Sequence, residues 1–359
     1  MARQAAVLPN PVLGVEVENF SGSGPFRGTD LSETTASIEQ TLELGGKRSA
    51  RVAAGRAEVT AAQARARRVL GEYAFDLAAA YAEAEASERR LQLAIELLSL
   101  TQEDARVANA LVDAGREADL RGVQAQAAVH AARAAVDEAR AARATAFGNL
   151  TALSGTASPI TSIPTSLLDQ TAPILATSGG DPSTTPAYAA AQAEREAAAR
   201  RLRLERTQAV PDVALSVGVR RFNDEDATAL VAGVSVPLPL FDRNRGNIAA
   251  ARAEVAAAEA RLNAARLEAD AAARSGAARQ AASETRLAAA REAERTAEEA
   301  YRLTRIGYEG GKLALLEVLN ARRELAEART QTIDAAVERV SAQAALARLN
   351  GVAIPGDQP

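Results

Sequence analysis

Side chains that commonly carry catalysis or bind metals are scarce in this chain. His130 is the single histidine, cysteine does not occur, and neither a nucleophile motif nor a phosphate-binding glycine loop is found. His130 lies in an alanine- and arginine-rich stretch with no second ligand at a useful spacing. We therefore expect no catalytic residues, no cofactor and no resident metal site, and the sequence does not predict an enzyme.

Charged residues are abundant but balanced. The 46 acidic and 42 basic residues give a net charge of -4, and carboxylates alternate with arginines as they do on the solvated ion-pair faces of helices. No basic stripe is left over for nucleic acid, so we expect no nucleic-acid partner. The elements that these residues build are therefore more informative than the residues taken singly.

Alanine supplies much of the 47% hydrophobic content, whereas aromatic residues make up only 3%. Alanine mixed with Glu and Arg is typical of long helices and coiled coils, in which small side chains allow close packing. The sequence has no run of about 18 apolar residues, so a transmembrane helix is not expected. Its N-terminal segment, MARQAAVLPNP, lacks the hydrophobic stretch of a signal peptide, which fits a protein that is not exported or a chain whose front is missing.

Two stretches, at about 11–44 and 212–240, alternate apolar with polar or small residues in the period of a β-strand. Each contains two runs around a turn-forming loop, and each run has roughly ten residues, enough to cross a bilayer in a tilted barrel wall. An open sheet edge in lipid is unfavourable, so several chains would have to share such a barrel. Alternation alone fits equally well a pair of soluble hairpins packed on helices.

Long helical stretches follow each hairpin. The expected helices lie at about 48–112, 118–153, 187–209, 244–306 and 312–349. Every seventh residue from Leu70 to Val112 is apolar, which predicts a narrow seam against a partner helix.

The two halves of the chain match each other. Residues 1–155 form a first repeat and 187–351 a second, separated by a Pro-, Ser- and Thr-rich connector at 156–186 and followed by a tail at 352–359. The matched positions include Pro9 and Phe20 with Pro211 and Phe222, Leu42 and Leu44 with Leu238 and Leu240, Gly115 with Gly310, and Val123 with Val318. Each half is therefore a hairpin, a long helix, a tight reversal and a returning helix.

Within this repeat, LELGGKR at 42–48 and VPLPLFDRNRG at 236–246 resemble the TolC family of outer-membrane efflux channels, and most closely its CzcC-like (cobalt-zinc-cadmium resistance) branch. The resemblance covers nearly the whole chain. It implies a mainly α, TolC-like fold with β hairpins, in a homotrimer whose chains each give four strands to one transmembrane β-barrel in outer-membrane lipid. The long helices would form a periplasmic tunnel beneath that barrel.

The resemblance also implies a function. Family members are passive ducts of tripartite efflux systems, and a periplasmic adaptor protein and an inner-membrane pump dock beneath them. The resemblance to the metal-exporting branch suggests heavy-metal cations as the exported substrate, but drug, peptide and protein exporters share this architecture, so the cargo stays open. A periplasmic or soluble coiled-coil adaptor or scaffold is the alternative. An adaptor is expected to carry a lipoyl-like all-β domain beside one helical hairpin, whereas this chain alternates two hairpins of each kind.

The helix reversals at Asp113–Arg116 and Gly307–Gly311 would then be periplasmic tips, where family members narrow the pore and meet the adaptor. The candidate tip and pore residues are Gly115, Gly307, Tyr308, Gly310, Gly311, Glu317 and Asn320. The family often carries two carboxylates three residues apart after the second reversal, and Asn320 replaces the second, which halves the charge of the ring. Tyr308 matches a tyrosine of closed-state contacts, but its acidic partner falls at Gly122 and a gating arginine at Leu313. Roles as an ordinary tip residue and a solvated helix charge stay open for Tyr308 and Glu317.

The N-terminus is the largest departure from the family. Members begin with an export signal and an additional helix before the first strand, and only the tail of that helix, about Ala2–Leu8, is present here. We expect a truncated front on an outer-membrane protein of a Gram-negative bacterium that extends into the periplasm.

Overall fold

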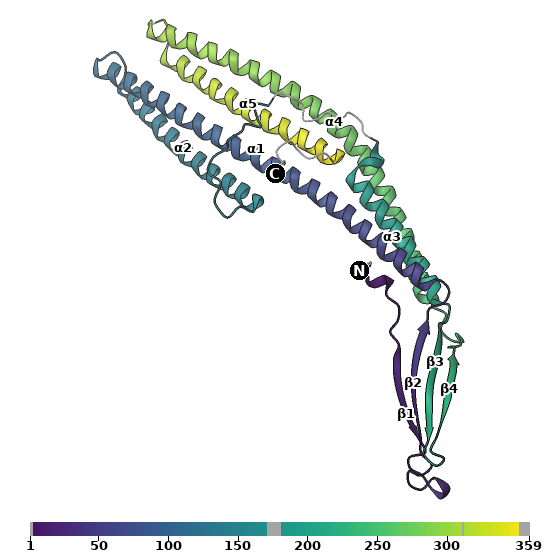
Figure 1. Cartoon of the computed structure of the whole chain (residues 1–359). Coiled ribbons are helices and arrows are strands. Elements are labelled where there is room, and N and C mark those ends of the chain that lie inside the picture. Colours follow the sequence, from purple (N-terminus) through teal and green to yellow (C-terminus); the bar gives the residue numbers. More distant parts are fainter. Residues whose placement is uncertain (1–2, 171–180, 311, 352–359) are drawn as a thin grey trace. The chain divides into compact units, whose positions relative to one another are not determined.

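The computed structural model describes residues 3–170, 181–310 and 312–351, and the structure separates into two compact units. Unit 1 comprises Met1–Ala66 with Ala187–Leu267, and unit 2 comprises Arg67–Pro186 with Glu268–Pro359. The mainly helical class with β hairpins, expected from the sequence, is confirmed (Figure 1). Three short 3₁₀ turns complete the described elements, at Gln4–Ala6, Gly24–Phe26 and Pro182–Thr184.

Unit 1 contains one four-stranded antiparallel sheet. Its strands are β1 (Val12–Glu18), β2 (Glu33–Leu42), β3 (Val213–Phe222) and β4 (Ala227–Ser235), and they lie side by side in that order (Figure 1). The two predicted hairpins therefore join through β2 and β3, which pair from Glu33 with Phe222 to Leu42 with Val213. The sheet is continuous across the boundary between the two sequence repeats.

The second hairpin is shorter than its alternating pattern predicted. Residues 236–240 continue the alternation, but β4 ends at Ser235. Pro237 and Pro239 lack a backbone N–H and cannot donate to a ladder. In addition, β3 begins at Val213, opposite position 236, so residues 237–240 have no partner in β3.

The long helices are α1 (Lys47–Asp113) and α4 (Arg245–Glu309), with 67 and 65 residues. At about 1.5 Å per residue each is about 100 Å long. A third helix, α3 (Pro186–Gln208), leads into β3. In unit 1 these helices pack through alanines, including Ala61, Ala197 and Ala258, all at most 6% exposed. Small side chains let the helix backbones approach closely, which explains the alanine-rich composition.

Two returning helices, α2 (Asp119–Ser154) and α5 (Leu315–Asn350), complete unit 2. In Figure 1, α2 runs beside α1 and α5 beside α4. One core cluster joins Ala82 and Ala86 to Leu287, Ala335 and Val340. The returning helices stop at glycines in the left-handed conformation, Gly155 (φ 65°) and Gly351 (φ 66°), a backbone state that other residues adopt at a cost.

None of the helices in the described part of the chain combines the length and the hydrophobicity needed to cross a membrane.

The repeat predicted from the sequence is visible in the hydrogen bonds of the two reversals. The amide of Arg116 donates to the carbonyl of Leu111, and the amide of Lys312 donates likewise to Gly307. This equivalence makes the predicted pairing of Gly115 with Gly310, and of Val123 with Val318, wrong by one residue. The position equivalent to Gly115 is Gly311, which lies outside the described residues, and the two adjacent glycines explain the ambiguity in the sequence.

Candidate functional site

The sheet of unit 1 has one apolar face. Strand register places Leu13, Ile38, Val217 and Ala232 in one row across the four strands. The adjacent row on the same face contains Val15, Ala36, Val219 and Leu230. These side chains have no cover within the described chain, and Leu230 is 85% exposed. A continuous exposed apolar patch of this kind marks a surface that meets lipid or protein rather than water.

The opposite face of the sheet is polar and small. It carries Glu16, Glu18, Glu33, Ser37, Glu39, Ser216, Gly218 and Arg220. Gly218 is needed for close packing, because a Cβ there would lie 2.5 Å from the carbonyl oxygen of Ala36. On β4 this face carries small or apolar residues, among them Ala229, Val231 and Gly233. The sheet is thus amphipathic over β1 to β3, where successive residues point to opposite faces.

Arg220 organises this polar face near the β1–β2 loop. Its guanidinium donates from Nε to Thr35 Oγ1 (3.0 Å) and from Nη1 to Glu33 Oε2 (2.9 Å), and it lies 2.9 Å from Glu18 Oε2. These residues come from β1, β2 and β3, so the cluster ties three strands together. One arginine faces four glutamates on this surface, which leaves the face acidic.

The outer strands of the sheet, β1 and β4, are each paired along one edge only. Their other edges present backbone N–H and C=O groups that pair with no strand in the described chain. Such edges are templates for pairing with another strand. An amphipathic sheet with two open edges is therefore incomplete as a single chain.

The first helix reversal, between α1 and α2, is a Schellman motif. Gly115 has φ 66°, and its amide donates to Val112 while the amide of Arg116 donates to Leu111. Gly115 is exposed, and a Cβ there would meet nothing within 4 Å. Its conformation, rather than its packing, requires glycine.

The second reversal, between α4 and α5, uses its glycines differently. Gly307 lies close to the side chain of Leu313, because a Cβ there would be 2.6 Å from Leu313 Cδ1 and would require that side chain to move. Gly310 is exposed, and its amide closes the last turn of α4 on Ile306 (3.0 Å). Gly311, also predicted as a tip residue, lies outside the described residues.

Tyr308 lines a cavity of about 330 Å³ in unit 2, together with Asp104, Glu117, Leu313 and others. Its hydroxyl is buried and has no hydrogen-bond partner among the residues that the structure describes. Burial and the nearby charge of Glu117 raise the pKa of Tyr308. Leu313, where the family resemblance would place an arginine, lines this cavity too, whereas Gly122 packs against Asn109.

The other two predicted tip residues lie apart from Tyr308. Glu317 is exposed in the first turn of α5, where a carboxylate is favoured by the helix dipole. Asn320 is half-buried and accepts a hydrogen bond from Arg323 Nη2 (3.2 Å). Neither residue lines the cavity around Tyr308. The tip roles of these residues stay predictions.

A polar contact that the sequence did not reveal lies at the wall of this cavity, because Asp104 belongs to both. Asp104 of α1 forms a short ion pair with Arg322 of α5, and both side chains are largely buried. Burial raises the pKa of Asp104 despite the attraction of Arg322. The same buried charge, together with desolvation, raises the pKa of Tyr301 on α4. The site therefore disfavours the negative charge that it holds.

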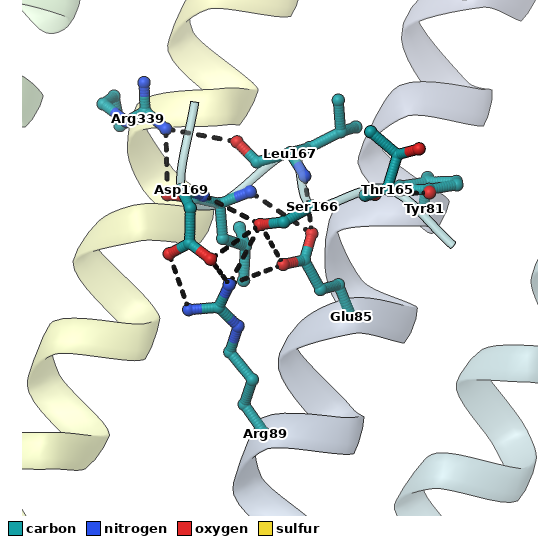
Figure 2. A network of polar contacts seen from close by, with 9 residues as sticks. Tyr81, Glu85, Arg89, Thr165, Ser166, Leu167, Asp169 and Arg339 are labelled. Carbon is teal, nitrogen blue, oxygen red and sulfur yellow. Dashed lines mark hydrogen bonds and ion pairs between the residues drawn. The ribbon is translucent and has the colours of Figure 1, made fainter. Parts of the chain in front are cut away.

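A second network fixes the connector to α1 and α5, as Figure 2 shows. We call it the connector clamp; its residues are Tyr81, Glu85, Arg89, Thr165, Ser166, Leu167, Leu168, Asp169 and Arg339. Glu85 is only 5% exposed, and its carboxylate accepts hydrogen bonds from the amides of Leu167 (2.8 Å) and Leu168 (3.2 Å). It also accepts hydrogen bonds from Ser166 Oγ and from the guanidinium of Arg89.

Two arginines complete the clamp. Arg89 also donates to Asp169 Oδ1 (3.0 Å), and this bond holds the pKa of Asp169 below its usual value. The buried Arg339 donates to the carbonyls of Leu167 (3.2 Å) and Leu168 (3.1 Å). Leu168 is fully buried between these groups, so this part of the predicted connector is a docked segment.

The comparisons with known proteins agree with this architecture. The family profile described as outer membrane efflux protein matches residues 2–156 and 183–352. The chain belongs to the outer membrane efflux protein family. The two matched segments leave out most of the connector and coincide with the two repeats.

Relatives of this outer membrane efflux protein are named for metal resistance. It is 44% identical over 250 residues to the nickel-cobalt-cadmium resistance protein NccC of Alcaligenes xylosoxydans xylosoxydans, a match that covers 70% of this chain and 57% of NccC. It is 30% identical over 353 residues to the cobalt-zinc-cadmium resistance protein CzcC of Cupriavidus metallidurans, covering 97% of this chain and 82% of CzcC. The chain thus spans less than two thirds of NccC.

Solved structures share the fold. The outer membrane protein VceC of Vibrio cholerae aligns with a TM-score of 0.76 at 22% identity, over 98% of this chain and 89% of VceC. CusC aligns with a TM-score of 0.80 at 20% identity, over 98% of this chain and 85% of CusC. At such low identity the likeness concerns the fold.

The residues that the structure describes contain no group of three or more His, Cys, Asp or Glu side chains that could hold a metal ion. His130 is exposed and lies 3.4 Å, between Nε2 atoms, from Gln126 on the same helix.

Proposed function

We propose that the chain is one protomer of a homotrimeric outer-membrane duct in a tripartite efflux system. Three copies would each contribute β1–β4 to one closed β-barrel, with the apolar face toward lipid and the polar face toward a water-filled lumen. The amphipathic, open-edged sheet is the observation that carries this proposal, because barrel closure pairs its edges and lipid covers its apolar face.

The helices support the second part of the proposal. Helices of about 100 Å are far longer than the roughly 30 Å hydrocarbon core of a bilayer, so they extend well beyond the membrane that the sheet would occupy. In this reading they form a tunnel through the periplasm, and the reversals after α1 and α4 meet a periplasmic adaptor and an inner-membrane pump. The pump supplies the energy, and the duct conducts passively.

Divalent metal cations are the proposed cargo. The matched relatives are named for nickel, cobalt, zinc and cadmium resistance. The acidic polar face of the sheet, with Glu16, Glu18, Glu33 and Glu39 around a single Arg220, supports a lumen that favours cations. No ligand cage is required, because ions crossing a wide duct keep their hydration shells.

Trimer formation and conductance test the duct. The full-length protein is expressed in a Gram-negative host, and its mass is measured after detergent extraction from separated outer membranes. We expect heat-sensitive trimers that conduct in planar bilayers and prefer cations in a KCl gradient. A soluble monomer would overturn the proposal in favour of a coiled-coil scaffold, and trimers that insert without conducting would exclude a duct.

Orientation of the sheet is tested by two neighbouring substitutions. Val217→Arg places a charge on the apolar face at the middle of β3, and we expect a cost of about 2–4 kcal/mol and loss of outer-membrane trimers. Ser216→Arg places the same charge on the polar face, beside Glu39, and trimers should persist. Equal loss from both variants would contradict the lipid-facing assignment.

Cargo is tested by growth. A metal-sensitive host carrying the duct with its cognate adaptor and pump should tolerate more Ni²⁺, Co²⁺ or Cd²⁺ than a host in which only the duct is deleted. Unchanged metal tolerance, with intact trimers in the outer membrane, would exclude metal export and leave the duct itself standing.

A further inference from the structure

The segment that joins β4 to α4, residues 236–244, carries the most exposed large apolar side chain among the described residues. Phe241 is fully exposed, and Leu238 and Leu240 are largely exposed. Pro237 and Pro239 alternate with these leucines and have no backbone N–H to donate to a strand. Large apolar side chains gathered on a surface in this way indicate a contact with lipid or protein.

Hydrogen bonds brace this segment and hold its apolar side chains outward. The amide of Leu240 donates to the carbonyl of Leu238 (2.8 Å), and Arg243 Nε donates to the carbonyl four residues earlier (3.2 Å). Asn244 Nδ2 fixes the end of the segment to α3, because it donates to both the backbone carbonyl and the carboxylate of Glu205 (2.8 Å each). The exposure of the apolar side chains is therefore a property of a fixed turn.

The first repeat shows what the same position looks like when protein covers it. Leu44 is the equivalent of Leu240, so Gly45 is the equivalent of Phe241. Gly45 has φ 64°, and a Cβ added there would lie 2.8 Å from Val210 Cβ, so this contact has no room for a side chain. The second repeat places a phenyl ring at that position. Phe241 therefore cannot take part in a protein contact of this kind.

Two exposed arginines, Arg243 and Arg245, follow the apolar side chains. Neither forms an ion pair within the part of the chain that the structure describes. The equivalent of Arg243 in the first repeat is Lys47, which is buried and lies 2.8 Å from Asp212. Asp242, also exposed, uses one carboxylate oxygen to accept the amide two residues later (2.8 Å). The segment thus combines exposed apolar groups with exposed guanidinium groups.

The length of the strands sets the depth of this segment in a bilayer that covers the apolar face of the sheet. Strand β3 has 10 residues, which span about 33 Å, or about 23 Å when the strand is tilted by about 45°. This height matches the apolar band of about 25 Å in barrels of the outer-membrane type. Residues just beyond the helix end of the sheet therefore fall at the boundary between acyl chains and headgroups.

We propose that residues 236–245 form an interfacial anchor for the inner leaflet of the outer membrane. Phe241 and the two leucines insert among the acyl chains, and Arg243 and Arg245 bind phospholipid phosphates. The proposal rests on the proposed function, because it requires the apolar face of the sheet to lie in the same bilayer. Phosphate suits these arginines, since a guanidinium donates two parallel hydrogen bonds to phosphate oxygens while its apolar stem stays in the acyl region. Each copy carries one anchor, which fixes the height of its sheet in the bilayer.

Fluorescence tests the insertion of Phe241, because the chain contains no tryptophan. The full-length Phe241→Trp variant is reconstituted in vesicles of phosphatidylethanolamine and phosphatidylglycerol whose acyl chains carry bromine near the headgroup or near the chain end. Fluorescence of the protein without the substitution is subtracted. Interfacial side chains lie about 5–10 Å below the headgroups, so bromine near the headgroup should reduce the indole signal about twofold or more, and bromine near the chain end clearly less.

Two matched variants calibrate the depth. Val217→Trp lies on the apolar face at the middle of β3 and should be quenched most by bromine near the chain end, whereas Phe222→Trp lies on the polar face and should be quenched by neither. Quenching at Val217→Trp but not at Phe241→Trp would show that protein covers the segment, which overturns the anchor and leaves the duct standing. An unquenched Val217→Trp would refute the lipid-facing sheet, and the proposed function with it.

The arginines are tested by the heat resistance of trimers in vesicles with and without phosphatidylglycerol. Anionic headgroups attract nearby cations, so the unmodified trimers should dissociate at a higher temperature when this lipid is present. Arg243→Gln/Arg245→Gln should lose about half or more of that gain, and Arg243→Lys/Arg245→Lys should keep most of it because both positive charges remain. A gain of equal size in the glutamine variant would overturn headgroup binding.

Discussion

Two regions of unit 2 hold buried carboxylates in opposite ways. One is the connector clamp; the other comprises the Asp104–Arg322 ion pair and the cavity beside Tyr308, and is called the reversal end. In the clamp, Glu85 accepts two backbone amides, a hydroxyl and a guanidinium, and the neighbouring Asp169 has a lowered pKa. At the reversal end, burial raises the pKa of Asp104 although Arg322 faces it, and the Tyr308 hydroxyl beside the cavity has no hydrogen-bond partner among the described residues. A carboxylate that accepts several hydrogen bonds fixes its surroundings, whereas one held against the cost of burial leaves them more room to rearrange.

The difference fits the positions of the two networks in the proposed duct. The clamp holds the connector to α1 and α5, and we expect this attachment to stay rigid when the duct opens. The reversal end would open to admit substrate, so a weakly favoured ion pair and a cavity lower the cost of rearrangement. The four predictions below would sharpen or break this contrast.

The largest effect is expected from Glu85→Ala in the clamp. This change leaves two backbone amides and Arg89 without their buried acceptor, at a cost of about 3–5 kcal/mol. Hydrogen exchange at the amides of Leu167 and Leu168 should accelerate by about 100-fold or more, since each 1.4 kcal/mol is tenfold. Glu83→Ala removes an exposed partner of Arg90 on the same helix, and its cost should stay below about 1 kcal/mol. Similar exchange in both variants would mean that the clamp is an ordinary surface network.

The second largest effect is expected from breaking the ion pair between Asp104 and Arg322 at the reversal end. Arg322→Met leaves Asp104 buried without its cation, and we expect a loss of about 2–3 kcal/mol, measured by chemical denaturation. The double variant Arg322→Met/Asp104→Leu should recover most of this loss, because a buried ion pair can be replaced by packed apolar groups at little cost.

The corresponding clamp variant, Glu85→Leu/Arg89→Met, should not recover. Glu85 also serves backbone amides, which no apolar side chain can satisfy. Recovery in both double variants would remove the distinction between the two regions.

These two networks also mark where the sequence stopped being informative. Alternating apolar residues and the repeat were sufficient to predict the hairpins, the long helices and the fold class. Asp104 and Arg322, in contrast, are two charges among many on alternating helix faces, and they meet across 218 positions of the chain. Nothing local distinguishes them from solvated residues.

The connector and the reversals show the same limit of what sequence patterns can predict. Proline, serine and threonine correctly predicted a break in the helices, but Leu168 is fully buried there because of partners on α1 and α5 that its own segment does not encode. At the second reversal, the neighbouring glycines 310 and 311 allowed two alignments of the repeat, and only the backbone hydrogen bonds decide between them. Tertiary partners, rather than local pattern, supply what the sequence lacked.

A matched pair of tyrosines gives a smaller effect with opposite signs. Tyr81→Phe removes a hydroxyl that donates to the carbonyl of Thr165 (2.6 Å), and we expect a loss of about 1 kcal/mol. Tyr308→Phe removes a buried hydroxyl that has no partner in the described part of the chain, so stability should stay unchanged or rise slightly. The measurement is thermal unfolding of each variant and of the unmodified protein, which gives the stability change caused by each substitution. A loss of equal size in Tyr308→Phe would show that its hydroxyl is satisfied in the assembled protein.

The smallest effect is expected from pH, because Arg322 offsets part of the burial of Asp104. A raised pKa means that the folded form binds its proton more readily than the unfolded chain, so acidification stabilises the reversal end. This gain begins as pH falls through the raised pKa and is complete below the ordinary value near 3.8. Asp169 behaves in the opposite sense. Its contribution to the stability of the folded state is present above pH 3.8, the ordinary pKa of the group, and is lost only as pH falls through its lowered pKa.

Protection factors for amide exchange in α1 near Asp104 and at residues 167–168 would separate the two responses. Between neutral pH and about 4, protection near Asp104 should rise while protection in the clamp stays constant. Asp104→Asn cannot titrate, so this variant should abolish the rise and leave the clamp unaffected. If acidification instead loosened the reversal end in the unmodified protein, the attraction of Arg322 would outweigh burial, and the reversal end would be held by the same charge-stabilising chemistry as the clamp.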